Sequence, residues 1–310
     1  MMIEKQEPIQ EGLPASPSSE TTRRQRPFFL FLVVLGCLAV LSIGMYGLPP
    51  TSPLVRAVSR VLPYPAVVVN TSVITLGDYA NEYDALIKFV VSADTQKPPS
   101  DEVVRQTILE ALTNKAAIRA LARTSGVKLD QKKVEAFYQD VVKGEESEQA
   151  LSKQLKETFG WSTQQFKKRI IESIVLAMQM SDSVLHDAKQ QEGPRADIQE
   201  ALKRLDAGEE FTTVAADVQQ KQGGAPQGDL GYQSVGSLPT EWAPAASLKI
   251  GERTPILESD QGFVILKVVD RIEAGEDSQV HLLAVAVPKK TLEDAVKAYL
   301  AEARVWTFIR

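Results

Sequence analysis

The longest uncharged apolar stretch of the chain lies near its N-terminus. Residues 28–48 read FFLFLVVLGCLAVLSIGMYGL and carry no charged side chain. A helix rises about 1.5 Å per residue, so a run of this length spans a bilayer core of about 30 Å. The pattern therefore predicts a transmembrane helix over Phe28–Leu48.

The charges that flank this run predict its orientation. Arg23, Arg24 and Arg26 precede the run, whereas Arg56 and Arg60 follow it at a greater distance. By the positive-inside rule, the N-terminus is expected in the cytoplasm and the rest of the chain on the extracytoplasmic side of the cell membrane.

The segments on either side of the run lack a core-forming pattern. Residues 1–27 are rich in Glu, Gln, Pro, Ser and Thr, which predicts a disordered cytoplasmic tail. Residues 49–65 contain five prolines and are expected to form a stiff linker. Two alternatives to a retained span stay open, a cleaved signal peptide and a lipoprotein signal in which Cys37 carries the lipid.

Beyond the linker, one short apolar strand precedes a series of amphipathic helices. The strand is expected at Ala66–Asn70, because AVVVN is β-branched and apolar. Two capping-box patterns, Thr75 with Asp78 and Ser162 with Gln165, mark helix starts. Apolar positions at helical spacing predict further helices after Ser100 and within residues 130–142 and 147–159.

The region from residue 187 onward alternates helices with strands. Two helices are expected between residues 194 and 220, and a strand-like DLGYQSV follows them. After a short helix from Pro239, two strands over 253–259 and 262–271 are joined by a tight turn, and Gln279–Val287 forms another strand. A last helix begins at Thr291, and residues 305–309 alternate as a final strand. The fold class predicted is therefore α+β, with a mainly helical part and a small antiparallel sheet flanked by helices.

Composition and charge narrow the range of functions. The net charge of −5 and the absence of a basic run interleaved with aromatics argue against nucleic-acid binding. The chain lacks the G-x-x-x-x-G-K-[ST] pattern, so no nucleotide is expected as a partner. One cysteine and two histidines leave little material for a metal site, and no cofactor is expected.

The helical region resembles the N-terminal chaperone domain of the SurA family, whose outline is shared with trigger factor and PrsA. The resemblance rests on VVVNTSVITLGDY and on the helix VVRQTILEALTNKAAIRALARTSGVKLD. It implies a chaperone domain over residues 66–186 that is completed by residues 291–310. In that architecture the chain end returns, so residues 305–309 are expected to pair with strand 66–70. Unfolded polypeptides would be the partners.

Residues 187–290 resemble a parvulin-type (rotamase) peptidyl-prolyl isomerase domain. The landmarks are AGEEF, GDLGY, SLPTEW, LKIGE and QGFVILKVVDR, in the order and spacing of that family. The resemblance implies an apolar peptide-binding pocket in which Leu238, Trp242 and Phe263 take the positions of the family's Met or Leu and two aromatics. The alternative for each of these three side chains is that it is an ordinary part of the hydrophobic core.

Two departures from the parvulin pattern bear on catalysis. The family's first strand, which carries a histidine, is replaced here by AKQQEGPR, which does not suit a buried strand. We expect Gln279–Val287 to fill that place, as in a circular permutation, so that His281 becomes the candidate catalytic residue. A strand histidine without a role is the equal alternative. Val264 stands where the family has a second histidine.

Together these patterns favour a membrane-anchored, extracytoplasmic folding factor. It would bind unfolded or Pro-containing polypeptides without ATP and have weak or absent prolyl isomerase activity. One alternative is an active isomerase that uses His281. A second alternative is a scaffold subunit of a membrane complex.

Overall fold

The structure is a computed structural model that describes residues 44, 46–49, 52–59, 61–92, 99–222 and 228–309. The predicted tail and nearly all of the predicted span Phe28–Leu48 lie outside these residues. Within the described ranges, no helix combines the length and the apolar character needed to cross a membrane.

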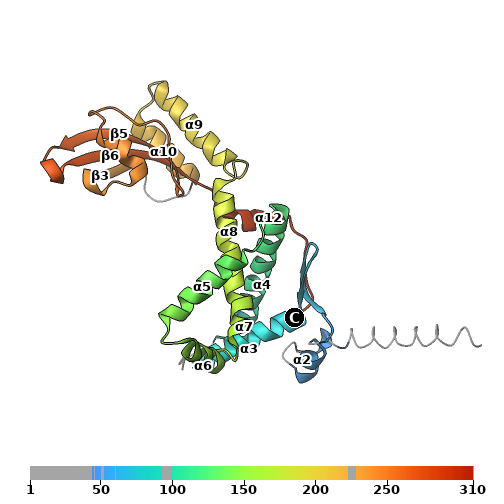
Figure 1. The fold of residues 1–310 in the computed structure, drawn as a ribbon. Coiled ribbons are helices and arrows are strands. Elements are labelled where there is room, and N and C mark those ends of the chain that lie inside the picture. The colour runs from blue at the N-terminus through green and yellow to red at the C-terminus, as the bar shows by residue number, and fades with distance from the viewer. Residues whose placement is uncertain are drawn as a thin grey trace, which may run out of the picture.

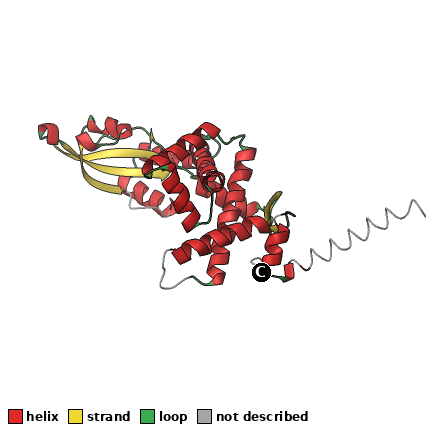
Figure 2. Ribbon diagram, turned by 60° about the horizontal axis from the view of Figure 1, so that its bottom comes forward, coloured by secondary structure: helices red, strands yellow, loops and turns green. Residues whose placement is uncertain are grey.

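The described chain forms two lobes that are joined at the end of one long helix (Figure 1). The first lobe is mainly helical and contains a small three-stranded sheet. The second lobe holds the larger sheet, and Figure 2 shows its strands lying together with a few helices around them. The predicted α+β fold class with small antiparallel sheets is therefore confirmed.

The helical lobe is built from both ends of the described chain. Its N-terminal elements run in order as α2 (Pro53–Ser59), β1 (Pro65–Val69), β2 (Ser72–Thr75), α3 (Leu76–Ser92), α4 (Asp101–Thr124), α5 (Gln131–Gly144), α6 (Glu148–Thr158), α7 (Thr163–Phe166), a π-helical turn (Lys167–Ile171) and α8 (Glu172–His186). The chain returns to this lobe in α12 (Leu292–Glu302) and β7 (Val305–Thr307).

The second lobe is inserted between α8 and α12. It comprises α9 (Glu192–Asp206), α10 (Phe211–Gln222), β3 (Gly228–Ser234), α11 (Ala243–Ala246), β4 (Leu257–Glu258), β5 (Gly262–Ile272) and β6 (Gln279–Pro288), with short 3₁₀ turns at 235–237, 240–242 and 275–277.

The helix starts in the first lobe follow the predicted capping residues. The Ser162 hydroxyl accepts a hydrogen bond from the Gln165 backbone N–H, and the Gln165 side chain accepts from the Ser162 N–H. Thr75 and Asp78 make the same reciprocal pair at the start of α3. These bonds satisfy backbone N–H groups that have no partner within the helix.

The last strand closes the sheet of the first lobe, as predicted. β7 pairs antiparallel with β1, so that Thr307 lies opposite Val67 and Val305 opposite Val69. Ile309 then enters the core that Val67 and Val69 share with α2, α3 and α4. The two ends of the described chain, more than 230 residues apart in sequence, are therefore parts of one folded unit.

In the second lobe, β6 occupies the centre of the sheet. The strand order is β3–β6–β5–β4, and β6 pairs antiparallel with both neighbours. The predicted strand Gln279–Val287 is therefore confirmed, and it forms a hairpin with β5. The equivalence of β6 to the first strand of parvulins stays a prediction.

Gly262 allows β5 and β6 to approach closely at one end of their pairing. It lies opposite Pro288 at φ 153°, and a Cβ at this position would lie 2.3 Å from the Val287 carbonyl oxygen. Because that contact is with backbone, it cannot be relieved by a rotamer change.

We predict that Gly262→Ala lowers the free energy of unfolding of the second lobe by about 1–3 kcal/mol, the usual range for overpacking. Urea denaturation followed by circular dichroism measures the change. Gly193→Ala in α9 is the matched control, because nothing lies within 4 Å of a Cβ there and helical glycine is unfavourable. Equal midpoints for both variants would contradict the assignment of the close contact.

Candidate functional site

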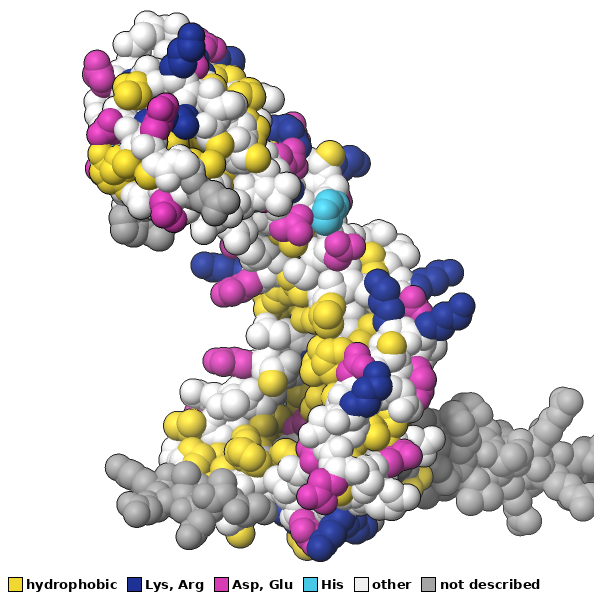
Figure 3. All heavy atoms as spheres, turned by 60° about the vertical axis from the view of Figure 1, so that its left-hand side comes forward, with side chains coloured by type: hydrophobic (Ala, Val, Ile, Leu, Met, Phe, Trp, Pro, Cys, Tyr) yellow, Lys and Arg dark blue, Asp and Glu magenta, His cyan; other side chains and the backbone are white. Residues whose placement is uncertain are grey.

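An apolar groove with a volume of about 620 Å³ opens in the helical lobe. Its walls come from α3, α4 and α8, and from the segment that joins α6 to α7. Figure 3 shows hydrophobic side chains gathered in a hollow on this face of the lobe. The apolar lining residues include Leu86, Phe89, Ile108, Leu112, Ile118, Leu129, Phe159, Trp161, Ile170, Ile174 and Leu176.

Three aromatic side chains form one wall of the groove. The Phe89 and Phe159 rings stack with centroids 5.6 Å apart, and the Phe159 and Trp161 rings follow at 5.1 Å. The Arg169 guanidinium lies 5.3 Å from the Trp161 ring. Phe89 is 45% exposed at the outer end of this stack, while Trp161 is buried at the inner end. The wall thus offers a preordered aromatic surface that costs little conformational entropy on binding.

Charged side chains also line the groove, namely Lys115, Arg119, Arg169, Glu82 and Glu172. Lys115 lies partly buried on α4, and its Nζ donates to the Arg169 carbonyl oxygen at 2.8 Å. Arg169 belongs to the π-helical turn, and the Ser173 hydroxyl donates to the same carbonyl at 2.8 Å. Burial lowers the pKa of Lys115, and the positive charge of Arg119 lowers it further.

In the second lobe, the structure brings Leu238 and Trp242 together on one face of the sheet. Both are half-buried against Val264, Leu266 and the even-numbered residues of β6. Val264, which replaces the histidine of the parvulin pattern, therefore faces this cluster. The cluster of Leu238 and Trp242 therefore meets an apolar side chain at the position where parvulins have a histidine.

Phe263 lies on the opposite face of the sheet. It is 1% exposed and packs with Ile198, Phe211 and Val214 of α9 and α10. Side chains alternate across a strand, so Phe263 and Val264 must point in opposite directions. The prediction that Phe263 lines a pocket with Leu238 and Trp242 is thus wrong in its geometry, and Phe263 is a core residue here.

His281 also lies away from Leu238 and Trp242. Its neighbours Val280 and Leu282 both pack in the cluster of Leu238 and Trp242, so its own side chain points to the other face. There the Nε2 atom lies 2.5 Å from Asp229 Oδ1. The structure does not assemble His281 and the apolar cluster into one site, and a catalytic role of His281 stays a prediction.

The surroundings of His281 form a small polar cluster on the surface. The Tyr232 ring lies 4.9 Å from the imidazole, and the Tyr232 hydroxyl donates to Asp270 on β5. A hydrogen bond from the Gly231 backbone N–H lowers the pKa of Asp229, and His281 lowers it further. This arrangement keeps Asp229 ionised and holds the imidazole in place across three strands.

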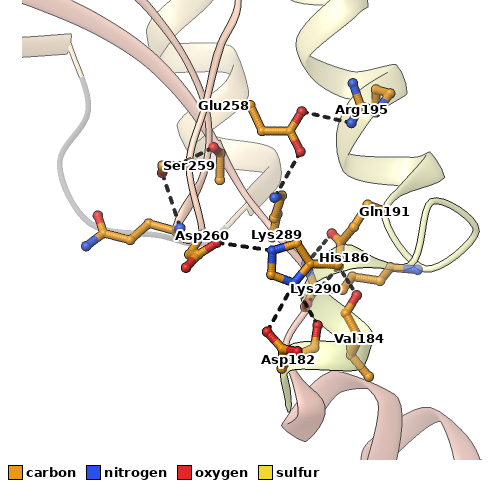
Figure 4. A network of polar contacts seen from close by, with 12 residues as sticks. Asp182, Val184, His186, Gln191, Arg195, Glu258, Ser259, Asp260, Lys289 and Lys290 are labelled. Atoms are coloured by element: carbon orange, nitrogen blue, oxygen red, sulfur yellow. Dashed lines mark hydrogen bonds and ion pairs between the residues drawn. The ribbon is translucent and has the colours of Figure 1, made fainter. Parts of the chain in front are cut away.

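The histidine that borders Trp242 is His186, which belongs to the end of α8. With Pro239, Glu241 and the 258–261 turn, these two side chains line a pocket of about 450 Å³ where the two lobes meet. His186 Nδ1 lies 2.9 Å from the Asp182 carbonyl oxygen, and Nε2 lies 3.6 Å from Asp260 Oδ1 (Figure 4).

A buried glutamine ties together the two chain segments that connect the lobes. Gln191 is 2% exposed, and its amide donates to the carbonyl oxygens of Val184 and Lys290. Its side-chain oxygen accepts from the Lys290 N–H at 2.9 Å. Figure 4 shows these bonds meeting between the end of α8 and the strand that leads to α12.

An ion-pair network completes the junction. Glu258 accepts from Lys289 and Arg195, each at 2.9 Å, and the Lys289 side chain is only 4% exposed. The hydrogen bond from Lys289 lowers the pKa of Glu258, with a further lowering by Arg195. The Lys289 ammonium also lies 5.6 Å from the Phe263 ring.

Comparisons with known protein families agree with this architecture. Residues 64–181 match the SurA N-terminal domain, and residues 174–270 match the PPIC-type PPIASE (rotamase) domain. In this pair of domain matches the chain resembles SurA and PrsA proteins. The rotamase match ends before β6, so the central strand of the sheet lies outside the matched residues.

Several curated relatives match parts of the chain. Chaperone SurA of Thiobacillus denitrificans is 24% identical over 269 residues, which cover 74% of this chain and 62% of that protein. Chaperone SurA of Alcanivorax borkumensis is 26% identical over 246 residues, with 66% and 56% covered. Foldase protein PrsA of a Geobacillus species is 38% identical over 77 residues, with 24% and 28% covered. The chain thus spans roughly three fifths of the length of the SurA relatives.

Sequence reasoning missed the aromatic wall of the SurA N-terminal domain. Phe159 and Trp161 lie in a turn, where helical periodicity gives no information, and Phe89 lies near the end of α3. The sequence FGW, with two large aromatics around a glycine between helices, was the available signal. His186 was also missed, because its closeness to Trp242 depends on how the lobes are joined.

We predict that Glu258→Gln destabilises the protein by about 1–2 kcal/mol at neutral pH, because it leaves the buried Lys289 ammonium without its carboxylate. The expected destabilisation is small because Glu258 is partly exposed, and solvent screens its charge. Since folding lowers the pKa of Glu258, its contribution is present above the ordinary value of 4.5 and is lost as the pH falls through the lower folded value.

Urea titrations between neutral and acidic pH test this prediction. Wild type and variant should converge as the pH falls. Glu200→Gln is the control, because its ion pair with Lys203 is exposed and 3.6 Å long. A constant difference between wild type and Glu258→Gln across the pH range would refute the role of the Glu258 charge.

Proposed function

We propose that this chain is a membrane-anchored, extracytoplasmic folding factor that binds unfolded polypeptides without ATP. The open apolar groove of the SurA N-terminal domain is the observation that carries the proposal. Its aromatic wall and aliphatic lining suit apolar segments that a folded protein would bury. The names of the relatives, chaperone and foldase, support the same function.

The groove has the physical properties of a reversible binding site. Ile108 and Leu112 are buried in the groove, whereas Phe89 and Ile174 are 45% and 38% exposed at its rim. Lys115 and Arg119 line the groove beside its apolar surface, so a bound extended backbone can find hydrogen-bond donors there. Binding of this kind needs no nucleotide.

The rotamase domain would contribute peptide binding with weak or absent isomerase activity. Prolyl isomerisation must cross a barrier of about 18–20 kcal/mol, and an apolar slot lowers it only where it favours the twisted amide. Here Trp242 and Leu238 offer such a surface, but Val264 supplies no polar group and His281 faces away. An active isomerase is the second candidate, favoured by the open pocket beside Trp242. The third is a scaffold of a membrane complex.

We predict that the pair of substitutions Phe89→Ser and Ile174→Ser weakens binding of an unfolded client by roughly tenfold or more. Burying one large apolar side chain contributes about 1.5–3 kcal/mol, and 1.4 kcal/mol corresponds to a factor of ten. Suppression of client aggregation and fluorescence-anisotropy binding measure the effect.

Val91→Ser is the matched control for this experiment. Val91 lies on the same helix and is 73% exposed, but it does not line the groove. Its variant should bind as the wild type does. Loss of binding in both variants, or in neither, would show that the groove does not hold the client.

A protease-coupled proline assay separates the chaperone from the isomerase. We expect a rate close to the uncatalysed one for the wild type, and the same rate for His281→Ala, because the imidazole is on the far face from Trp242. Catalysis that is lost in both His281→Ala and Trp242→Ala, in variants that still fold, would instead support the active isomerase.

A further inference from the structure

The small sheet of the helical lobe exposes an apolar row on its outer face. Val73, Val68 and Trp306 lie side by side across β2, β1 and β7. Val73 is 55% exposed and Trp306 is 56% exposed. Their neighbours Val67 and Val69 point the other way into the core, so this row faces outward. Together with Phe308, which is 40% exposed, we call these residues the sheet patch.

The sheet patch adjoins the point where the chain enters the lobe from its N-terminal side. The Tyr46 ring lies 5.8 Å from the Phe308 ring, and the Tyr46 hydroxyl donates to the Pro65 carbonyl at 3.0 Å. Tyr46 also belongs to the apolar run 28–48 that predicts the span. The end of that run is therefore fixed against the edge of the sheet that carries the patch.

This position determines what the patch would contact. If residues 28–48 cross the bilayer, Tyr46 lies at the level of the lipid headgroups, and Phe308 lies beside it. Trp306 is two residues away, which is about 7 Å along a strand. Tryptophan and tyrosine favour this interfacial layer because one end of the ring is apolar and the other is polar.

We propose that the sheet patch docks on the bilayer surface, so that Trp306 and Phe308 lie in the interfacial layer next to the span. This inference rests on the membrane anchor of the proposed function. Arg123, which donates to the Ser72 hydroxyl at 2.7 Å, adds a positive charge at the turn beside Val73, which suits anionic headgroups. Docking holds the lobe in one orientation relative to the membrane.

A second copy of the chain fits this surface less well. β7 is an edge strand of only three residues, so pairing with another copy would add few backbone hydrogen bonds. For an unfolded client, the proposed binding site is the apolar groove on a different part of the lobe, lined by α3, α4 and α8. Neither of these occupants explains why the exposed aromatics gather where the apolar run ends.

Quenching by brominated lipids tests the docking. The full chain is reconstituted into vesicles of phosphatidylethanolamine and phosphatidylglycerol, with or without acyl-brominated phosphatidylcholine, and compared with Trp306→Phe. Trp306 is one of three tryptophans, so the wild type should lose up to about a third of its emission in brominated vesicles. The Trp306→Phe variant should lose almost none, because Trp161 is buried in the groove and Trp242 lies in the other lobe.

The outcomes separate docking from anchoring. Flotation of the vesicles shows whether the full chain is anchored at all, and a chain that does not float removes both proposals. A chain that floats but is quenched equally in wild type and Trp306→Phe overturns docking and leaves the anchor standing. Crosslinking between copies through the patch, again without bromine quenching, would assign this surface to a dimer and equally overturn docking.

Discussion

One constraint determines the architecture: the two ends of the inserted second lobe must meet at one junction with the helical lobe. The chain leaves the helical lobe after α8 and must return to it at α12, because β7 has to complete the sheet that begins with β1. Gln191 fixes this return by bonding to the exit segment at Val184 and to the re-entry segment at Lys290. A buried amide with all of these partners satisfied is costly to disrupt.

This constraint accounts for the unusual strand order of the second lobe. β6 is the last strand in sequence and yet lies at the centre of the sheet, between β3 and β5. Its direction carries the chain along the whole sheet to the junction, where Lys289 enters the network with Glu258. Because β6 fills the central position, its even-numbered residues face Leu238 and Trp242, and its odd-numbered residues, including His281, face the other way.

The sequence alone predicts the helices and the caps well, because each of these depends on local patterns. The capping residues Ser162 and Thr291 act as expected. The pairing of the last strand with the first is long-range, and it was expected from the resemblance to the SurA family. The candidate site was harder to predict. The faces of Phe263 and His281 depend on strand register and on a bulge near Asp270. The groove depends on Phe159 and Trp161, which lie outside any periodic pattern.

Site-specific photo-crosslinking tests the central claim, that clients bind in the groove of the helical lobe, most directly. A photoreactive benzoylphenylalanine replaces Ile174 at the groove rim or, as a comparison, Ile272 on the second lobe, which is 46% exposed. With an unfolded client, the account predicts strong crosslinks from position 174 and weak ones from position 272. Crosslinks of equal strength from both positions, or from position 272 alone, would contradict it.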